Sequence, residues 1–322
     1  MNNRREFLAR AAGAVGASLA LGHTAGARPD AGEADERQPT LRRQESDADA
    51  PLFGISLAQW SLHRRLRAGE LDHLDFAPFT REQFGIDAVE YVNSFFGGRG
   101  ADFDYLRETR RRADDAGVQS LLIMVDGEGS LGDADEGRRR RAVEKHFKWI
   151  AASAFLGGHA IRVNAGGSGD EDEISKRAAE SLNHLCRVGD DYGVDVIVEN
   201  HGGLSSNGAW LAKTIERADH PRAGTLPDFG NFNLGGGKQY DRYQGVAELM
   251  PFARAVSAKA HEFDAEGNEI HTDYARMLRI VVEAGYRGHV GIEWEGKQPA
   301  DEVEGIRLTQ RLLERVREQL AG

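Results

Sequence analysis

Three acidic side chains stand at or near the ends of short apolar segments. Glu199 ends the run DVIVE, Asp228 follows TLP, and Glu293 follows HVGI. An unpaired carboxylate costs many kcal/mol in a low-dielectric interior, so buried carboxylates that converge must share protons, cations or a metal ion. With His261, at the end of AVSAKAH, they form a donor set of three carboxylates and one imidazole. This set suits a divalent cation such as Mn²⁺, Mg²⁺, Co²⁺ or Zn²⁺.

Convergence requires a fold that brings these segments together. From residue 51 onward, short apolar segments alternate with longer amphipathic stretches whose apolar residues recur every three or four positions. Repeated strand–helix alternation predicts an α/β fold, a single (β/α)8 TIM barrel over residues 51–322. The rival, a doubly wound open sheet, is disfavoured because no G-x-G-x-x-G follows the first strand. The eight predicted strands are residues 53–59, 87–93, 118–125, 160–165, 195–200, 223–229, 255–261 and 289–294.

The carboxyl ends of the strands in such a barrel form the active site. Other polar residues there are therefore candidates for contacts with a substrate. Lys259 either steadies a developing oxyanion or pairs with Glu293 or Asp228, and Glu90 and Arg162 either bind hydroxyl groups or pair with each other. Glu295 shares the strand face of Glu293 and is the alternative ligand. The predicted substrate-binding residues are Trp60, His63, Glu90, Arg162, His201 and Lys259.

Composition excludes several classes of function. The formal charge of −11 and an isoelectric point near 5.5 argue against a nucleic-acid partner, which requires a basic surface. The single cysteine, Cys186, forbids an internal disulfide and a multi-cysteine metal site. The sequence does not determine the oligomeric state, and a homo-oligomer is one of the alternatives.

The first fifty residues differ from the rest. Arg4 and Arg5 precede a weakly apolar run and the small-residue sequence Ala25-Gly26-Ala27. This pattern resembles a twin-arginine export signal over residues 1–27, cleaved after Ala27. Residues 28–50 are nearly free of apolar side chains and are predicted to be a disordered linker. We therefore expect a periplasmic or other extracytoplasmic location, with no stable membrane insertion after cleavage.

Four motifs resemble the xylose-isomerase-like superfamily of sugar isomerases and epimerases. They are VIVENHGG, TLPDFGNF, VSAKAHEFD and HVGIEWEG, and the resemblance covers roughly residues 52–318. It implies metal ligation by Glu199, Asp228, His261 and Glu293, with the two glutamates as acid and base. Many relatives carry the third ligand in an H-x-K motif, whereas this chain has Ser257-Ala258-Lys259. His261 lies on the same strand face as Ser257; if it does not ligate, three carboxylates and water would hold the ion.

These residues predict one type of chemistry. A divalent ion that takes up enolate charge makes the carbon next to a sugar carbonyl acidic, and two carboxylates can then move its proton. We expect an isomerase or epimerase that forms an enediolate on an unphosphorylated keto-sugar, with Mn²⁺ favoured. The first alternative is a lyase or dehydratase that eliminates the aglycone or water from a 3-keto-glycoside or keto-sugar. The second is a non-catalytic sugar-binding protein.

Overall fold

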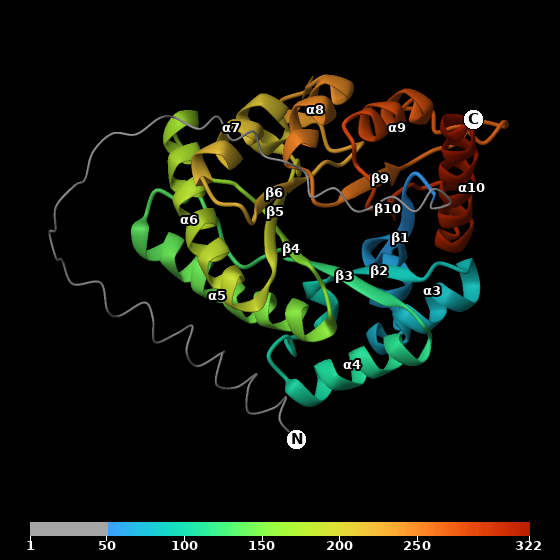
Figure 1. The fold of residues 1–322 in the computed structure, drawn as a ribbon, viewed down its shortest axis with the longest axis horizontal. Helices are drawn as coiled ribbons and strands as arrows, with labels where there is room; N and C mark the ends of the chain where they lie inside the picture. Colours follow the sequence, from blue (N-terminus) through green and yellow to red (C-terminus); the bar gives the residue numbers. More distant parts are fainter. Residues whose placement is uncertain (1–50) are drawn as a thin grey trace, which may run out of the picture.

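The structure is a computed structural model that describes residues 51–322. The predicted signal (1–27) and linker (28–50) lie outside the described residues. A curved parallel sheet of eight strands occupies the centre, and helices surround it (Figure 1). The strands are β1 (Gly54–Ala58), β2 (Ala88–Val92), β3 (Gln119–Met124), β4 (Ala160–Val163), β5 (Asp195–Glu199), β6 (Ala223–Leu226), β9 (Val256–Ala260) and β10 (His289–Trp294).

The sheet closes into a barrel. Its strand order is β6-β5-β4-β3-β2-β1-β10-β9, so β6 and β9 are the two ends. Isolated parallel bridges join Thr225 to Ala253 and Asp228 to Ser257, and they bring those two ends together. The predicted (β/α)8 barrel and all eight predicted strands are confirmed, with shifts of at most three residues at the strand ends.

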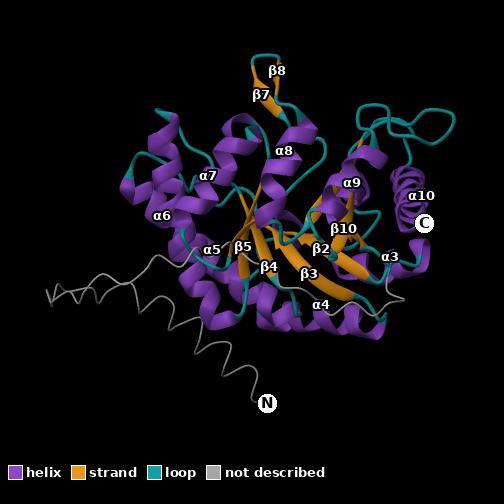
Figure 2. Ribbon diagram, turned by 45° about the horizontal axis from the view of Figure 1, so that its top comes forward, coloured by secondary structure: helices purple, strands orange, loops and turns teal. Residues whose placement is uncertain are grey.

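Helices follow the strands on the outside of the barrel. Asp or Asn side chains cap the start of most of them; for example, Asp170 Oδ1 accepts hydrogen bonds from the backbone N–H groups of Asp172 and Glu173. A short antiparallel hairpin, β7 (Asn233–Gly235) and β8 (Lys238–Gln239), projects from the barrel (Figure 2). The main helices are α3 (Phe76–Phe84), α4 (Phe103–Asp115), α5 (Glu136–Leu156), α6 (Glu171–Tyr192), α7 (Gly208–Ala218), α8 (Arg242–Leu249), α9 (Tyr274–Glu283) and α10 (Glu302–Ala321).

The remaining helical segments are short. They are η2 (Gln59–Leu62), α2 (His63–Ala68), η3 (His73–Asp75), η4 (Asn93–Phe96), η5 (Gly203–Ser206) and η6 (Met250–Phe252). Within residues 51–322, no helix has the length and apolar character that crossing a bilayer requires.

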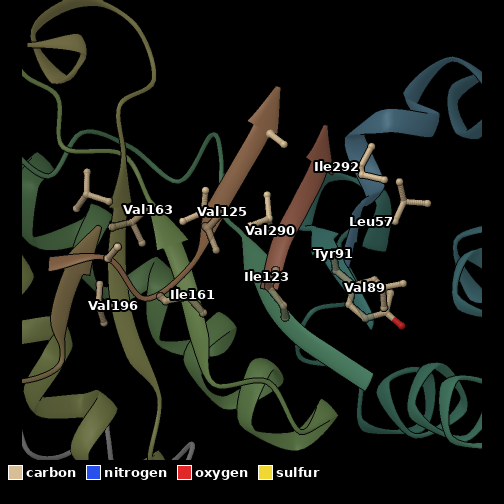
Figure 3. Packing of buried hydrophobic residues seen from close by; sticks show 14 of the residues in the cluster. Leu57, Val89, Tyr91, Ile123, Val125, Ile161, Val163, Val196, Val290 and Ile292 are labelled. Atoms are coloured by element: carbon tan, nitrogen blue, oxygen red, sulfur yellow. The ribbon is translucent and has the colours of Figure 1, made fainter. Parts of the chain in front are cut away.

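Strand side chains divide between two apolar clusters. Those that point outward pack against the helices and form the main core (Figure 3). Alternate residues point inward, and Ala58, Val92, Leu122, Met124, Ala160, Ile197, Leu226 and Ala255 form a smaller cluster. Because strand side chains alternate with a period of two, every second strand residue points into the barrel. Polar residues at these inward positions are exceptions to its apolar lining. The labelled outward residues in Figure 3 are Leu57, Val89, Tyr91, Ile123, Val125, Ile161, Val163, Val196, Val290 and Ile292.

Candidate functional site

Three of the predicted ligands meet at the barrel mouth. Carboxylate oxygens of Glu199 in β5, Asp228 just after β6 and Glu293 in β10 lie within 4.8 Å of one another. Each side chain is buried, with at most 5% of its surface exposed. Strand alternation explains their common direction, since each occupies an inward position of its own strand or strand extension.

A tight turn and a serine hold Asp228 in place. Its Oδ1 accepts hydrogen bonds of 2.8 Å from the backbone N–H groups of Gly230 and Asn231. Ser257 Oγ lies 2.6 Å from Asp228 Oδ2 and 3.1 Å from Glu293 Oε2. One hydroxyl has only one proton, so Ser257 donates a hydrogen bond to one of these carboxylates at a time. It lies between Asp228 and Glu293, within hydrogen-bond distance of both.

Two buried cations flank the carboxylates. Arg162 Nε lies 2.9 Å from Glu199 Oε2, and its Nη1 donates to Asp126 Oδ1 at 2.7 Å. Lys259 Nζ lies 3.0 Å from Glu293 Oε1, because these two residues are direct neighbours in the register of β9 and β10. Of the alternatives open from sequence, Lys259 thus pairs with Glu293, and Arg162 pairs with Glu199 instead of Glu90.

Negative charge nevertheless exceeds positive charge in this interior. The ionised side chains of Glu90, Glu199, Asp228 and Glu293 would carry four negative charges against the two of Arg162 and Lys259. Burial raises the pKa of both Glu199 and Asp228 to about 7, and the neighbouring carboxylates add to the increase. Either protons or a divalent cation must compensate the excess.

The donor set fits a divalent cation. All three side chains offer carboxylate oxygens, which Mg²⁺ and Mn²⁺ prefer. Glu199 Oε2 is buried, and its ion-pair contact with Arg162 Nε at 2.9 Å lacks the geometry of a hydrogen bond. A buried oxygen of this kind calls for a further partner, and an ion among the three carboxylates would supply it.

His261 is not part of this group. Among residues 51–322, the cluster of ligand atoms contains only the three carboxylates. His261 lies one strand repeat, about 7 Å, beyond Lys259, and its ring centroid is 6.2 Å from that of His271. Ser257 instead touches the carboxylates. The structure therefore assembles the three-carboxylate alternative of the predicted site.

The other predicted substrate residues surround the mouth. Trp60 stacks on His63 with ring centroids 4.8 Å apart, and Trp60 Nε1 donates to Glu295 Oε1 at 2.9 Å. His63 Nδ1 donates to the Trp60 carbonyl. His201 lies beyond Glu199 and is exposed to solvent. These side chains can form the walls of a sugar site, with Glu295 fixed between Trp60 and Lys259.

Glu90 lies deeper in the barrel than the other candidates. It is almost fully buried, accepts a 2.6 Å hydrogen bond from Ser56, and leaves Oε2 without a partner. Gly291 faces it, and a Cβ at that position would collide with the Glu90 carboxyl group. Burial raises the pKa of Glu90 to about 7, and the charges of Glu293 and Glu199 add to this. Glu90 also lines a separate cavity of about 710 Å³.

Glu90→Gln is expected to change how stability depends on pH. Between pH 4.5 and 7 the unfolded chain has released a proton that folded Glu90 retains, so the free energy of unfolding falls as pH rises. The full change is about 3 kcal/mol. Glutamine cannot ionise, so the variant gains stability relative to wild type across this window. Urea titrations of metal-free protein from pH 5 to 8 measure this; a difference independent of pH would refute the assignment.

Sequence reasoning missed several residues of the site. Asp126 Oδ1 accepts hydrogen bonds from Arg162 Nη1 and Asn164 Nδ2. Asn231 Nδ2 donates to Glu199 Oε1 at 2.8 Å. Asn200 stabilises the turn at Asp228 by three hydrogen bonds. Its Oδ1 accepts from the backbone N–H of Asp228 at 2.7 Å, and its Nδ2 donates to the backbone carbonyls of Asp228 and Asn231. The D-x-G-N spacing in PDFGN, typical of an Asx turn, was the available signal for Asn231.

Asn200→Ala is expected to lower the free energy of unfolding by about 3 kcal/mol, because it leaves buried backbone groups of the Asp228 turn unpaired. Urea unfolding at pH 7 measures the change. Asn233→Ala, in the exposed β7, is the matched control and should cost less than about 1 kcal/mol. Equal losses in the two variants would show that Asn200 does not support the turn.

Comparisons with known proteins support the fold. A family model described as "Xylose isomerase-like TIM barrel" matches residues 81–316. A C-glycoside deglycosidase alpha subunit from Arthrobacter globiformis is 43% identical over 54 residues, which cover 17% of this chain and 15% of that protein. A 3'-dehydrocarminate deglycosidase alpha subunit from Microbacterium is 30% identical over 80 residues, 24% of this chain and 23% of that protein.

Solved structures share the fold over most of the chain. The zinc-bound IolI protein has a TM-score of 0.66 at 13% identity and covers 83% of this chain and 99% of its own. D-psicose 3-epimerase from Clostridium cellulolyticum H10 has a TM-score of 0.62 at 14% identity, with coverages of 83% and 99%. The 3-keto-D-glucoside 4-epimerase of E. coli has a TM-score of 0.59 at 15% identity, with coverages of 81% and 99%.

Proposed function

Because the chain belongs to the xylose isomerase-like TIM-barrel family, we propose that it is a metal-dependent enzyme that acts on an unphosphorylated keto-sugar. In this proposal the enzyme removes a proton from the carbon next to the sugar carbonyl. One observation carries the proposal: Glu199, Asp228 and Glu293, from three different strands, meet in a buried cluster with excess negative charge.

The proposed cofactor is one divalent ion held by these three carboxylates. Mn²⁺ is favoured, with Mg²⁺, Co²⁺ and Zn²⁺ as alternatives, because carboxylate oxygens suit harder cations. When bound, such an ion acts as a Lewis acid and takes up negative charge that develops on substrate oxygens. Asp228 Oδ1 accepts hydrogen bonds from two backbone N–H groups, which fix the carboxylate in place. We therefore assign Asp228 the role of a metal ligand and not that of acid or base.

Glu199 and Glu293 are the proposed acid and base. They come from β5 and β10, which are separated in the barrel order, so a sugar between them would present opposite faces to the two carboxylates. One carboxylate removes the proton from the carbon next to the carbonyl, and the other returns a proton to the opposite face or to the neighbouring carbon. Without an ion, burial raises the pKa of Glu199 to about 7, whereas a bound cation would lower this pKa and keep the carboxylate ionised, as a base requires.

An elimination is the second candidate, and the names of two relatives favour it. The same base would remove the proton next to the carbonyl of a 3-keto-glycoside. The electron pair of the broken C–H bond then forms a C=C bond, and the aglycone leaves with the electron pair of its own broken bond to the sugar and takes up a proton. Loss of water from a keto-sugar follows the same course. We also propose export by the twin-arginine route, supported by Arg4 and Arg5.

The test is proton exchange in D₂O. Protein loaded with Mn²⁺ is incubated with a panel of keto-sugars and 3-keto-glycosides, and deuterium at the carbon next to the carbonyl is followed by NMR. We expect deuterium incorporation, and the products then separate isomerase or epimerase from lyase. Sugar binding without any exchange would contradict the proposal and favour a non-catalytic binding protein.

A further inference from the structure

A second cavity opens beside the carboxylates. Its volume is about 500 Å³, and its walls come from β8, the start of α8, the segment after β9 and the loop after β10. The hairpin that contributes one wall is visible as β7–β8 in Figure 2. Apart from two glutamates and two glycines, the lining residues are Gln239, Arg242, His261, His271, Lys297 and Gln298.

The cavity adjoins the site described above. Glu295, one of its walls, accepts a 2.9 Å hydrogen bond from Lys259, and the same ammonium group lies 3.0 Å from Glu293. Gly230 is another wall, and its N–H bonds Asp228. A Cβ at Gly230 would stand 3.1 Å from the Lys259 side chain and 3.2 Å from the His261 ring. A side chain larger than glycine would therefore crowd Lys259 and His261 where the carboxylate site and this cavity meet.

The lining defines what the cavity can bind. It has no apolar side chain, whereas sites for aromatic groups are lined by apolar and aromatic residues. Its two permanent cations, Arg242 and Lys297, balance its two glutamates, so a neutral ligand fits better than a charged one. Amide, guanidinium, imidazole and carboxylate groups together offer donors and acceptors in all directions, as a ring of hydroxyl groups requires.

We propose that this cavity binds a second, uncharged sugar ring, so that the substrate is a keto-disaccharide or a longer keto-oligosaccharide instead of an aryl glycoside. The proposal rests on the proposed function, because the reacting ring must occupy the carboxylate site. Arg242 is already oriented for this role, since its Nη1 donates to Thr272 Oγ1 at 2.5 Å. The remaining N–H groups of its guanidinium can then donate to ligand hydroxyls with little loss of freedom.

Binding of unreactive glycosides tests the subsite separately from catalysis. Protein loaded with Mn²⁺ is titrated calorimetrically with three probes that lack the keto group: a glucosyl disaccharide, methyl glucoside and phenyl glucoside. We expect the disaccharide to bind about tenfold more tightly than methyl glucoside, which corresponds to about 1.4 kcal/mol from the added hydrogen bonds. Phenyl glucoside should gain no such advantage. A preference for phenyl glucoside, or no binding of the disaccharide, would overturn the subsite.

Substitutions in the cavity complete the test. Gln239→Ala should weaken disaccharide binding about fivefold relative to methyl glucoside, the effect of one lost hydrogen bond. Gln244→Ala, an exposed glutamine of α8 outside the lining, is the matched control and should change neither affinity. Equal effects of the two substitutions would refute the subsite. Deuterium exchange on a keto-monosaccharide reports on the proposed function alone, so its absence and a failure of disaccharide binding are separate results.

Discussion

Glu293→Gln lowers kcat/KM for conversion of the keto-sugar to product by about 10³-fold, and Glu199→Gln has an effect of the same order. Glutamine keeps an oxygen at each position but cannot accept a proton. The two residues act as a pair on one carbon, so the double substitution should cost little more than either single one. Product formation followed by NMR in D₂O, with metal content determined on the same samples, gives these values.

Glu216→Gln, on the exposed face of α7, is the control for this pair and should leave this conversion unchanged. Metal content separates loss of the base from loss of the ion. If either active-site variant retained full conversion of substrate to product with its metal in place, the assignment of that glutamate as acid or base would be refuted.

Removal of the divalent ion is expected to abolish exchange and to lower the melting temperature. Without the ion, the carboxylate cluster keeps its excess negative charge and must take up protons, since burial raises the pKa of Glu199 and Asp228 to about 7. An ion at 100 times its Kd adds about 2.7 kcal/mol to the free energy of unfolding. Thermal unfolding of chelator-treated protein, before and after addition of Mn²⁺, measures this shift.

Asp228→Asn tests whether the shift originates at the proposed site. The variant should unfold cooperatively yet respond much less to Mn²⁺, because it removes one of the three carboxylates. Asp104→Asn, on the exposed face of α4, should keep the full response. A melting temperature of the wild type that is indifferent to Mn²⁺ would contradict the metal proposal.

The barrel and the carboxylate cluster were predictable for a common reason. Strand residues alternate between two environments, so the inward direction of Glu199, Asp228 and Glu293 can be read from the apolar pattern around them. The apolar pattern does not indicate how far along its strand a side chain lies relative to the side chains of neighbouring strands. His261 has the same parity as Lys259 and Ser257 but is not among the ligand atoms that cluster within residues 51–322.

The sequence left the pairing of charges open among alternatives, of which Lys259 with Glu293 was one. Lys259 meets Glu293 because β9 and β10 are in a particular register, and Arg162 reaches Glu199 because β4 neighbours β5. Asp126 and Asn231 lie on loops, where no periodicity exists to indicate direction. Their roles depend on backbone turns that only the folded chain defines.

Anomalous diffraction from crystals grown with Mn²⁺ tests the central claim most directly. We expect a single strong peak between the carboxylates of Glu199, Asp228 and Glu293, within about 2.0–2.6 Å of an oxygen from each, the range of bonds to hard cations. Lys259 should remain paired with Glu293 or Glu295. A map with no peak among these three carboxylates, from protein that has bound Mn²⁺ in solution, would contradict the account.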